Sequence, residues 1–156
     1  MKLLLNFLFF FTLAFHFANG QSNAEHYQTR DYDIAIFPKE YQLHGFEKRF
    51  TPTKEEIFLA EEALQTQLKK INKNLPNQSH GPVIHKNLNK YKRQYFGVYD
   101  ENGKKILLIN FFWEDRPNEY WLQSEVQVDD GGSYYWQIKF SVEENQLFDL
   151  YINGYA

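Results

Sequence analysis

After Tyr91 the apolar residues alternate with polar ones at a period of two, the pattern of β-strands with one buried face. The alternation is clearest in one stretch, where a single face carries Tyr134, Trp136, Ile138, Phe140 and Val142. Similar segments cover residues 91–99, 104–113, 122–128 and 147–152, and in the last of them Phe148, Leu150 and Ile152 are expected to point inward. Short turns separate them, and Asn102-Gly103 suits a tight hairpin. The second half of the chain is therefore predicted to form an antiparallel sheet.

One amphipathic helix is predicted before these strands. Thr53 and Glu56 have the spacing of a capping box, in which each side chain satisfies a backbone donor at the helix start. Apolar residues then recur every three or four positions, at Ile57, Ala60, Leu64, Leu68 and Ile71. Glu61 and Glu62 lie off this stripe. The helix is expected to end in the Asn-, Pro- and Gly-rich stretch that begins at Asn72.

These elements predict an α+β domain in which one long helix packs on a four- to five-stranded antiparallel meander. Residues 32–37 alternate weakly before Pro38 and are interpreted as an edge strand, whereas the polar residues 21–28 are expected to lack order. The order of elements resembles the cystatin-like α/β roll. The Gln-x-Val-x-Gly motif of cystatins is missing, because the first hairpin tip reads Asp100-Glu101-Asn102-Gly103.

The N-terminus has the layout of a cleaved secretory signal. Lys2 precedes an apolar run from Leu3 to Phe17, and a small-x-small triplet ends at Gly20. The run is shorter than the roughly 20 residues that a membrane anchor needs. We therefore expect residues 1–20 to be removed, residues 21–45 to form an extended and partly disordered segment, and residues 46–156 to form one domain. The expected location is periplasmic or extracellular, without a membrane anchor.

Composition narrows the classes of function. The 156 residues include no cysteine, which excludes disulfides and thiolate chemistry. The net charge of −3 offers no basic field for a nucleic acid. The histidines show no zinc-ligand spacing, and no phosphate-binding glycine loop or nucleophile motif is present. The sequence thus predicts no metal, no cofactor and no nucleic-acid partner.

The segment from Ile106 to Trp113 is apolar on both faces, and only one of them can meet the helix. The other face needs cover from residues 27–50, from a second copy of the chain in a homodimer, or from a ligand. Four aromatic residues on or near the faces away from the predicted core are candidates for a stacking platform for a glycan or peptide: Trp113, Trp121, Tyr135 and Tyr151.

Several short motifs resemble a group of small, uncharacterised, secreted bacterial proteins of Bacteroidetes type. They are Phe46 to Thr53, Arg93-Gln94-Tyr95, Ile109-Asn110-Phe111, Asp130-Gly131-Gly132 and the ending Asn153-Gly154-Tyr155-Ala156. The resemblance covers roughly residues 46–156. It implies export and a shared surface, and no activity.

The functional hypothesis from sequence is an exported, non-enzymatic binding or interaction module that uses the second face of the sheet to bind a protein, peptide or glycan. A secreted hydrolase is one alternative, with His80 and His85 or the carboxylates of Glu114, Asp115, Glu119 and Glu125 in its site. A protease inhibitor that inserts the hairpin tip at 100–103 is another.

Overall fold

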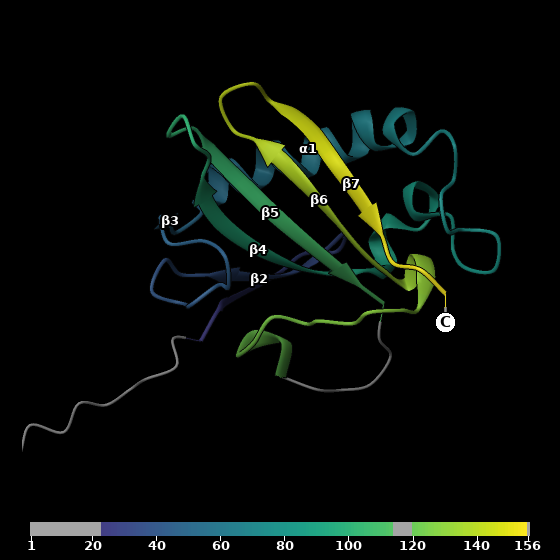
Figure 1. Cartoon of the computed structure of the whole chain (residues 1–156), viewed down its shortest axis with the longest axis horizontal. Helices are drawn as coiled ribbons and strands as arrows, with labels where there is room; N and C mark the ends of the chain where they lie inside the picture. Colours follow the sequence, from purple (N-terminus) through teal and green to yellow (C-terminus); the bar gives the residue numbers. More distant parts are fainter. Residues whose placement is uncertain (1–22, 114–119, 156) are drawn as a thin grey trace, which may run out of the picture.

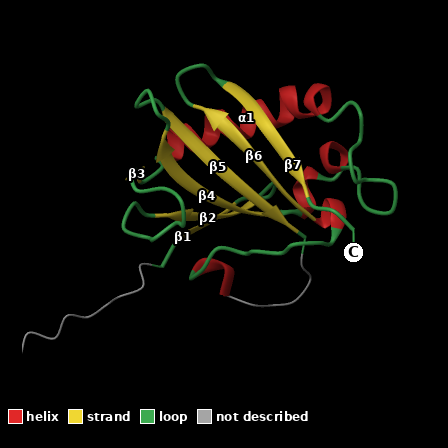
Figure 2. Cartoon of the chain, viewed as in Figure 1, coloured by secondary structure: helices red, strands yellow, loops and turns green. Residues whose placement is uncertain are grey.

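The computed structural model describes residues 23–113 and 120–155, which form one helix against a seven-stranded sheet. Figure 1 shows helix α1 (Lys54–Ile71) behind the strands, and Figure 2 separates helices, strands and loops by colour. The strands are β1 (Glu25–Gln28), β2 (Asp33–Phe37), β3 (Arg49–Phe50), β4 (Lys92–Tyr99), β5 (Lys105–Phe112), β6 (Tyr135–Ser141) and β7 (Gln146–Ile152). Short 3-10 turns occupy Ile84–Lys86, Leu88–Lys90, Tyr120–Leu122 and Gly132–Tyr134. The predicted α+β class is confirmed.

The sheet runs β1-β2-β4-β5-β6-β7, and β3 pairs with part of β4. Strands β4 to β7 form the expected antiparallel meander, whereas β2 lies parallel to β4. The strand number was underestimated, and three segments differ from expectation. Residues 33–37 are an interior strand rather than an edge, residues 25–28 form β1, and residues 122–128 contain no strand. The polar residues 25–28 gain order because their backbone pairs with the apolar strand β2.

Helix α1 begins as the sequence predicts. The Thr53 hydroxyl accepts from the Glu56 amide at 3.2 Å, and the Glu56 carboxylate accepts from the Thr53 amide at 2.9 Å. The apolar stripe of the helix is buried against one face of the sheet, with the exception of the half-buried Ile71 at its end. Glu61 departs from the prediction, because it is only 4% exposed.

Strand β5 buries apolar side chains on both of its faces, as predicted. Leu107, Ile109 and Phe111 pack in the helix-side core. Ile106 and Phe112 belong to a second core on the opposite face, and Leu108 packs against it. The second core is closed by residues outside the sheet, so the chain itself supplies much of the cover.

The last strand contains a bulge that changes which side chains face the helix. The register between β6 and β7 shifts between Gln137 and Lys139, and Asp149 has a φ of 50°. Leu147 and Ile152 consequently join the helix-side core, whereas Phe148 packs against the second core. The prediction that Phe148 shares one inward face with Leu150 and Ile152 was wrong, because a bulge inserts a residue into the alternation.

Side-chain amides form hydrogen bonds with backbone groups along the outer edge of β7. The Gln67 side chain accepts from the Leu147 amide at 3.0 Å and donates to the Asn145 carbonyl at 2.9 Å. The Asn77 side chain donates to the Ile152 carbonyl at 3.0 Å. Since an open strand edge invites pairing with another chain, these contacts protect both ends of β7.

Candidate binding groove on the second sheet face

Two segments lie across the sheet face opposite α1. The first covering segment is residues 38–48, and the second covering segment is residues 120–128. The Tyr41 ring packs against Phe37 in a T-shaped arrangement with ring centroids 4.6 Å apart, and Leu43 is 8% exposed in the same core. The Glu125 amide donates to the Tyr41 hydroxyl at 2.9 Å, which joins the two segments. Residues 27–50, one of the three covers considered from sequence, therefore cover part of this face. The second covering segment, which follows β5, covers another part.

Arg49 fixes the first covering segment to the sheet. Its guanidinium donates through Nη1 to the Tyr41 carbonyl and through Nε to the Gly97 carbonyl, both at 2.8 Å. Gly97 lies on β4 opposite Phe50, where an added Cβ would meet the Phe50 carbonyl oxygen. The absence of a side chain at Gly97 thus lets β3 approach β4 and sets the position of the segment that precedes it.

Two buried amides hold the second covering segment. Gln94 Nε2 donates to the carbonyls of Trp121 and Ser124 at 2.7 and 2.8 Å, and Gln94 Oε1 accepts from the Val126 amide at 2.8 Å. Asn110 Nδ2 donates to Gln94 Oε1 at 2.9 Å and to the Val126 carbonyl at 2.8 Å. Buried amides with this many partners specify one arrangement of the backbone they bind.

Between the two segments a groove of about 380 Å³ remains open. Its walls include Leu43 from the first segment and Glu125 from the second, and Phe96 and Leu108 lie on the sheet beneath. The volume falls within the roughly 300–1,000 Å³ of small-molecule sites. The groove is therefore a preformed concavity with apolar and polar walls.

One row of side chains crosses the sheet from the anchored amides into this groove. The strand registers place Gln94, Asn110, Gln137 and Tyr151 side by side across β4 to β7. The first two hold the second covering segment. The side chains of Gln137 and Tyr151 line the groove and make no polar or ring contact with the part of the chain that the structure describes. The row thus ends at the Gln137 amide and at the Tyr151 ring, and Tyr151 is 60% exposed.

The charged groups of the groove largely compensate one another. Lys139 Nζ lies 2.9 Å from Asp149 Oδ2, and Arg49 interacts electrostatically with Glu125, whose Oε2 also accepts from Gln127 Nε2 at 2.8 Å. His44 is exposed at the rim. The groove therefore presents no strong field of one sign.

The structure separates the four aromatic residues singled out from sequence. Tyr151 lines the groove. Trp121, 6% exposed, packs in the second core with its ring 5.8 Å from that of Phe112, and Tyr135 is half-buried beside the same strand end. Trp113 packs on the helix side against Tyr91 at 5.6 Å. They form no common platform: two belong to the second core, one lines the groove, and Trp113 lies on the other face.

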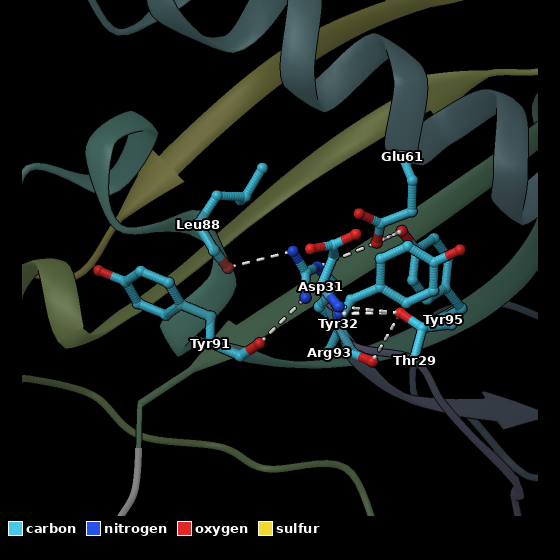
Figure 3. Close-up of polar contacts among 8 residues, drawn as sticks. All are labelled: Thr29, Asp31, Tyr32, Glu61, Leu88, Tyr91, Arg93 and Tyr95. Atoms are coloured by element: carbon cyan, nitrogen blue, oxygen red, sulfur yellow. Dashed lines mark hydrogen bonds and ion pairs between the residues drawn. The ribbon is translucent and has the colours of Figure 1, made fainter.

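A buried ion pair ties the helix to the sheet on the opposite face (Figure 3). Arg93 Nε on β4 lies 2.9 Å from Glu61 Oε1 on α1, and the Tyr95 hydroxyl donates to the same oxygen at 2.7 Å. Arg93 also donates to the carbonyls of Leu88 and Tyr91, each at 3.1 Å. Burial raises the pKa of the Glu61 carboxyl above its ordinary value of 4.5, although Arg93 and Tyr95 act in the opposite direction.

This network adjoins a second hollow of about 590 Å³ that His85 and Asp31 also line. The second carboxylate oxygen of Glu61 is buried there and accepts no hydrogen bond from any residue that the structure describes. Since that oxygen has almost no accessible surface, the network holds α1 against β4 rather than facing a ligand. Perturbed carboxyls in clefts can mark active sites, but structural ion pairs perturb them as well.

The residues of the hydrolase alternative do not gather in the described part of the chain. His85 Nδ1 lies 3.0 Å from Asn72 Nδ2, while His80 Nδ1 lies 2.9 Å from the Ser79 hydroxyl and its ring packs near Tyr155. Burial, with Lys86 and Lys69 nearby, lowers the pKa of His85. The loop carboxylates of Glu114, Asp115 and Glu119 lie outside the described residues, and Glu125 lines the groove on the second face.

Within residues 23–113 and 120–155, no cluster of three or more His, Asp or Glu side chains is placed to hold a metal ion. In the same residues, no helix has the length and apolar character that a bilayer crossing requires. The hairpin tip at 100–103 is a closed turn in which the Gly103 amide donates to the Asp100 carbonyl at 3.0 Å.

Sequence reasoning missed the polar residues that shape the groove. Gln94 and Asn110 each interrupt an apolar face of a predicted strand, and Gln137 alternates with the apolar residues Trp136 and Ile138 on the other face of its strand. A buried amide in such a strand needs partners, which was the available signal that a backbone segment crosses this face. The location of that segment could not be read from the pattern, because Leu122 to Val128 alternates like a strand.

Comparison with known proteins places the chain in no established family. No protein-family model, no curated protein and no solved structure matches it. The resemblances to secreted Bacteroidetes-type proteins and to the cystatin-like roll thus stay predictions from sequence.

Proposed function

We propose that this protein is an exported, non-enzymatic binding module that holds a small ligand in the groove between its two covering segments. The observation that carries the proposal is the groove itself, which is open although both segments beside it are anchored by internal hydrogen bonds. A site formed before the ligand arrives loses little conformational entropy on binding. The leader-like N-terminus supports the exported location.

The polar side chains of the row differ in whether they already have hydrogen-bond partners, and this difference supports a binding role for the groove. The side-chain amides of Gln94 and Asn110 donate hydrogen bonds to the backbone of the second covering segment. Gln137, in the same row, has no side-chain hydrogen bond to residues 23–113 or 120–155, so its donors and its acceptor oxygen are open to a ligand there, and Tyr151 presents an exposed ring beside it. Convergent polar groups in a partly apolar concavity are the usual composition of a ligand site.

A small ligand fits this surface better than a second copy of the chain. The covering segments occupy much of the second face, so a flat sheet-to-sheet contact there is obstructed. Strand addition at β7 is opposed by Gln67 and Asn77, which already bind backbone groups near its two ends. The groove remains as the accessible concavity on this face.

Backbone amide NMR of the purified protein tests the proposal. We would titrate it with soluble neutral disaccharides, charged sugars and short peptides, and follow the amides of Leu108, Gln137 and Tyr151. Saturable shifts centred on these residues are expected, and Leu108→Trp, which fills the groove, should abolish them. Phe58→Trp is the matched control, because Phe58 is 56% exposed on α1. Saturable shifts that cluster elsewhere, or no shifts with any of the three classes, would refute the groove as the binding site.

A further inference from the structure

We infer that the groove on the second sheet face binds a neutral carbohydrate, a mono- or disaccharide unit, and this inference rests on the binding function proposed above. A sugar ring has apolar C–H faces and a rim of hydroxyl groups. It therefore needs an exposed aromatic face together with planar groups that donate and accept hydrogen bonds. The groove supplies both kinds of group from separate elements.

Two exposed aromatic rings line the groove. Tyr151, on β7, is 60% exposed, and Phe46, in the first covering segment, is 38% exposed. Neither makes a ring contact within the described part of the chain. Gly45, with a φ of 82°, provides the left-handed turn that precedes Phe46. Aromatic rings left open to solvent beside a concavity provide a surface for the C–H face of a sugar.

The polar group beside Tyr151 suits a pair of adjacent hydroxyls. Gln137 lies directly opposite Tyr151 in the strand register, and its amide has two donor hydrogens and one acceptor oxygen. A planar amide can donate to one hydroxyl and accept from its neighbour. Asn110, next in the row, is already committed to the second covering segment. The Gln137 amide, which has no side-chain partner among the described residues, thus lies at the end of the row where the ring is exposed.

The charges of the groove favour an uncharged ligand. Lys139 and Asp149 lie 2.9 Å apart and compensate each other. An anionic ligand would have to compete with Asp149 for Lys139. A cationic ligand would have to compete with Lys139 for Asp149, or with Arg49 and Gln127 for Glu125. A neutral, hydroxyl-rich molecule can accept or donate without breaking this pair.

An extended peptide is less well matched. Peptides gain most of their affinity from main-chain hydrogen bonds to a sheet edge, and the floor of the groove is a sheet face whose strands are already paired. The second covering segment also uses its Val126 amide and carbonyl internally. Neither the paired strands of the floor nor Val126 therefore offers an unpaired backbone group to a peptide main chain.

The test uses the same NMR titration with defined probes. The neutral sugars are cellobiose, maltose, lactose and N,N′-diacetylchitobiose; the charged counterparts are a glucuronic-acid disaccharide and a glucosamine disaccharide; the peptide is tetra-alanine with blocked ends. At least one neutral sugar is expected to shift Gln137 and Tyr151 saturably and to bind at least tenfold more tightly than the charged sugars and the peptide.

Two variants and two matched controls locate the contacts. Tyr151→Ala and Gln137→Ala should each weaken sugar binding about threefold to tenfold, as expected for one lost stacking or hydrogen-bond contact. Phe58→Ala and Gln65→Ala remove an exposed ring and an exposed amide from α1 on the other side of the sheet, and should change binding less than about twofold. Thermal unfolding of all four variants shows whether each is folded.

The outcomes separate this inference from the proposed function. Saturable binding of the peptide or of a charged sugar in the groove, with no neutral sugar binding, overturns the carbohydrate inference and leaves the binding function intact. No binding of any probe in the groove overturns both. Sugar binding that is unchanged in folded Tyr151→Ala and Gln137→Ala also overturns the inference.

Discussion

Replacing Arg93 by methionine tests how the helix is held to the sheet. Arg93 has no exposed side-chain surface, pairs with Glu61 and donates to two backbone carbonyls. Methionine keeps much of the apolar stem but removes the charge and the donors. Glu61 would then be a buried carboxylate without its cation, and the carbonyls of Leu88 and Tyr91 would lose a donor.

The expected cost is about 3–5 kcal/mol, the usual penalty for removing one partner of a buried ion pair. This is a large part of the 5–15 kcal/mol by which domains are stable. With a urea dependence of about 2 kcal/mol/M, the unfolding midpoint should fall by roughly 2 M. Glu61 can limit the loss by taking up a proton, because burial already raises the pKa of its carboxyl and Arg93 no longer opposes it.

That proton makes the cost depend on pH. In Arg93→Met the folded protein holds the Glu61 proton to higher pH than the unfolded chain, whose carboxyl titrates near 4.5. The folded state therefore binds more protons above that pH, and the stability of the variant falls as pH rises. Arg93 restrains this effect in the wild type, so the difference in unfolding free energy between the two proteins should grow from pH 5 to pH 8.

Urea unfolding followed by tryptophan fluorescence at pH 5, 6, 7 and 8 measures this difference. Arg30→Met is the control, since the Arg30 side chain is 97% exposed and its loss should cost less than about 0.5 kcal/mol. Removing the whole network with Glu61→Leu, Arg93→Met and Tyr95→Phe together should restore at least half of the stability lost in the single variant. A loss below about 1 kcal/mol, or an equal loss when Glu61 is already leucine, would refute the reasoning.

Three further predictions follow from the anchors and the N-terminus. Gln94→Ala should cost about 2–3 kcal/mol, because it leaves buried groups of the second covering segment unpaired, and hydrogen exchange at the Val126 amide should accelerate beyond the change in global stability. Gly97→Ala should cost about 1–3 kcal/mol in urea unfolding, because its Cβ would meet the Phe50 carbonyl oxygen, whereas alanine at Gly154, where a Cβ meets nothing, should cost less. Mass spectrometry of protein expressed in a secreting bacterial host should find a chain that starts at Gln21; an intact leader on the secreted protein would contradict the signal-peptide interpretation.

Sequence patterns predicted the elements whose structure depends mainly on residues close together in the chain. The capping box at Thr53 and the two-faced apolar strand at Ile106 to Trp113 were recognised because burial acts on each residue at a fixed period. The hairpin at Asn102-Gly103 was recognised because its turn chemistry is local.

Elements that depend on distant partners were missed. Glu61 looked solvent-exposed because its cation, Arg93, is 32 positions away in sequence and on another element. Residues 122–128 have a strand-like alternation, but the side chains of Gln94 and Asn110 bind the backbone of Ser124 and Val126 in place of a neighbouring strand. Phe148 was placed on the wrong face because the bulge at Asp149 reverses the alternation. In each case a long-range contact overrides the local period.

The position of Gln94 links stability to the proposed site. Its side chain holds the backbone from Trp121 to Val126, and that backbone carries Glu125, one wall of the groove. A polar amide inside an apolar strand costs free energy unless all of its groups are paired, so an apolar residue would be the simpler choice for stability alone. The amide instead fixes one arrangement of the second covering segment over the sheet. Because the groove exists only when this segment stays in place, loss of the Gln94 contacts should weaken ligand binding even though Gln94 itself does not line the groove.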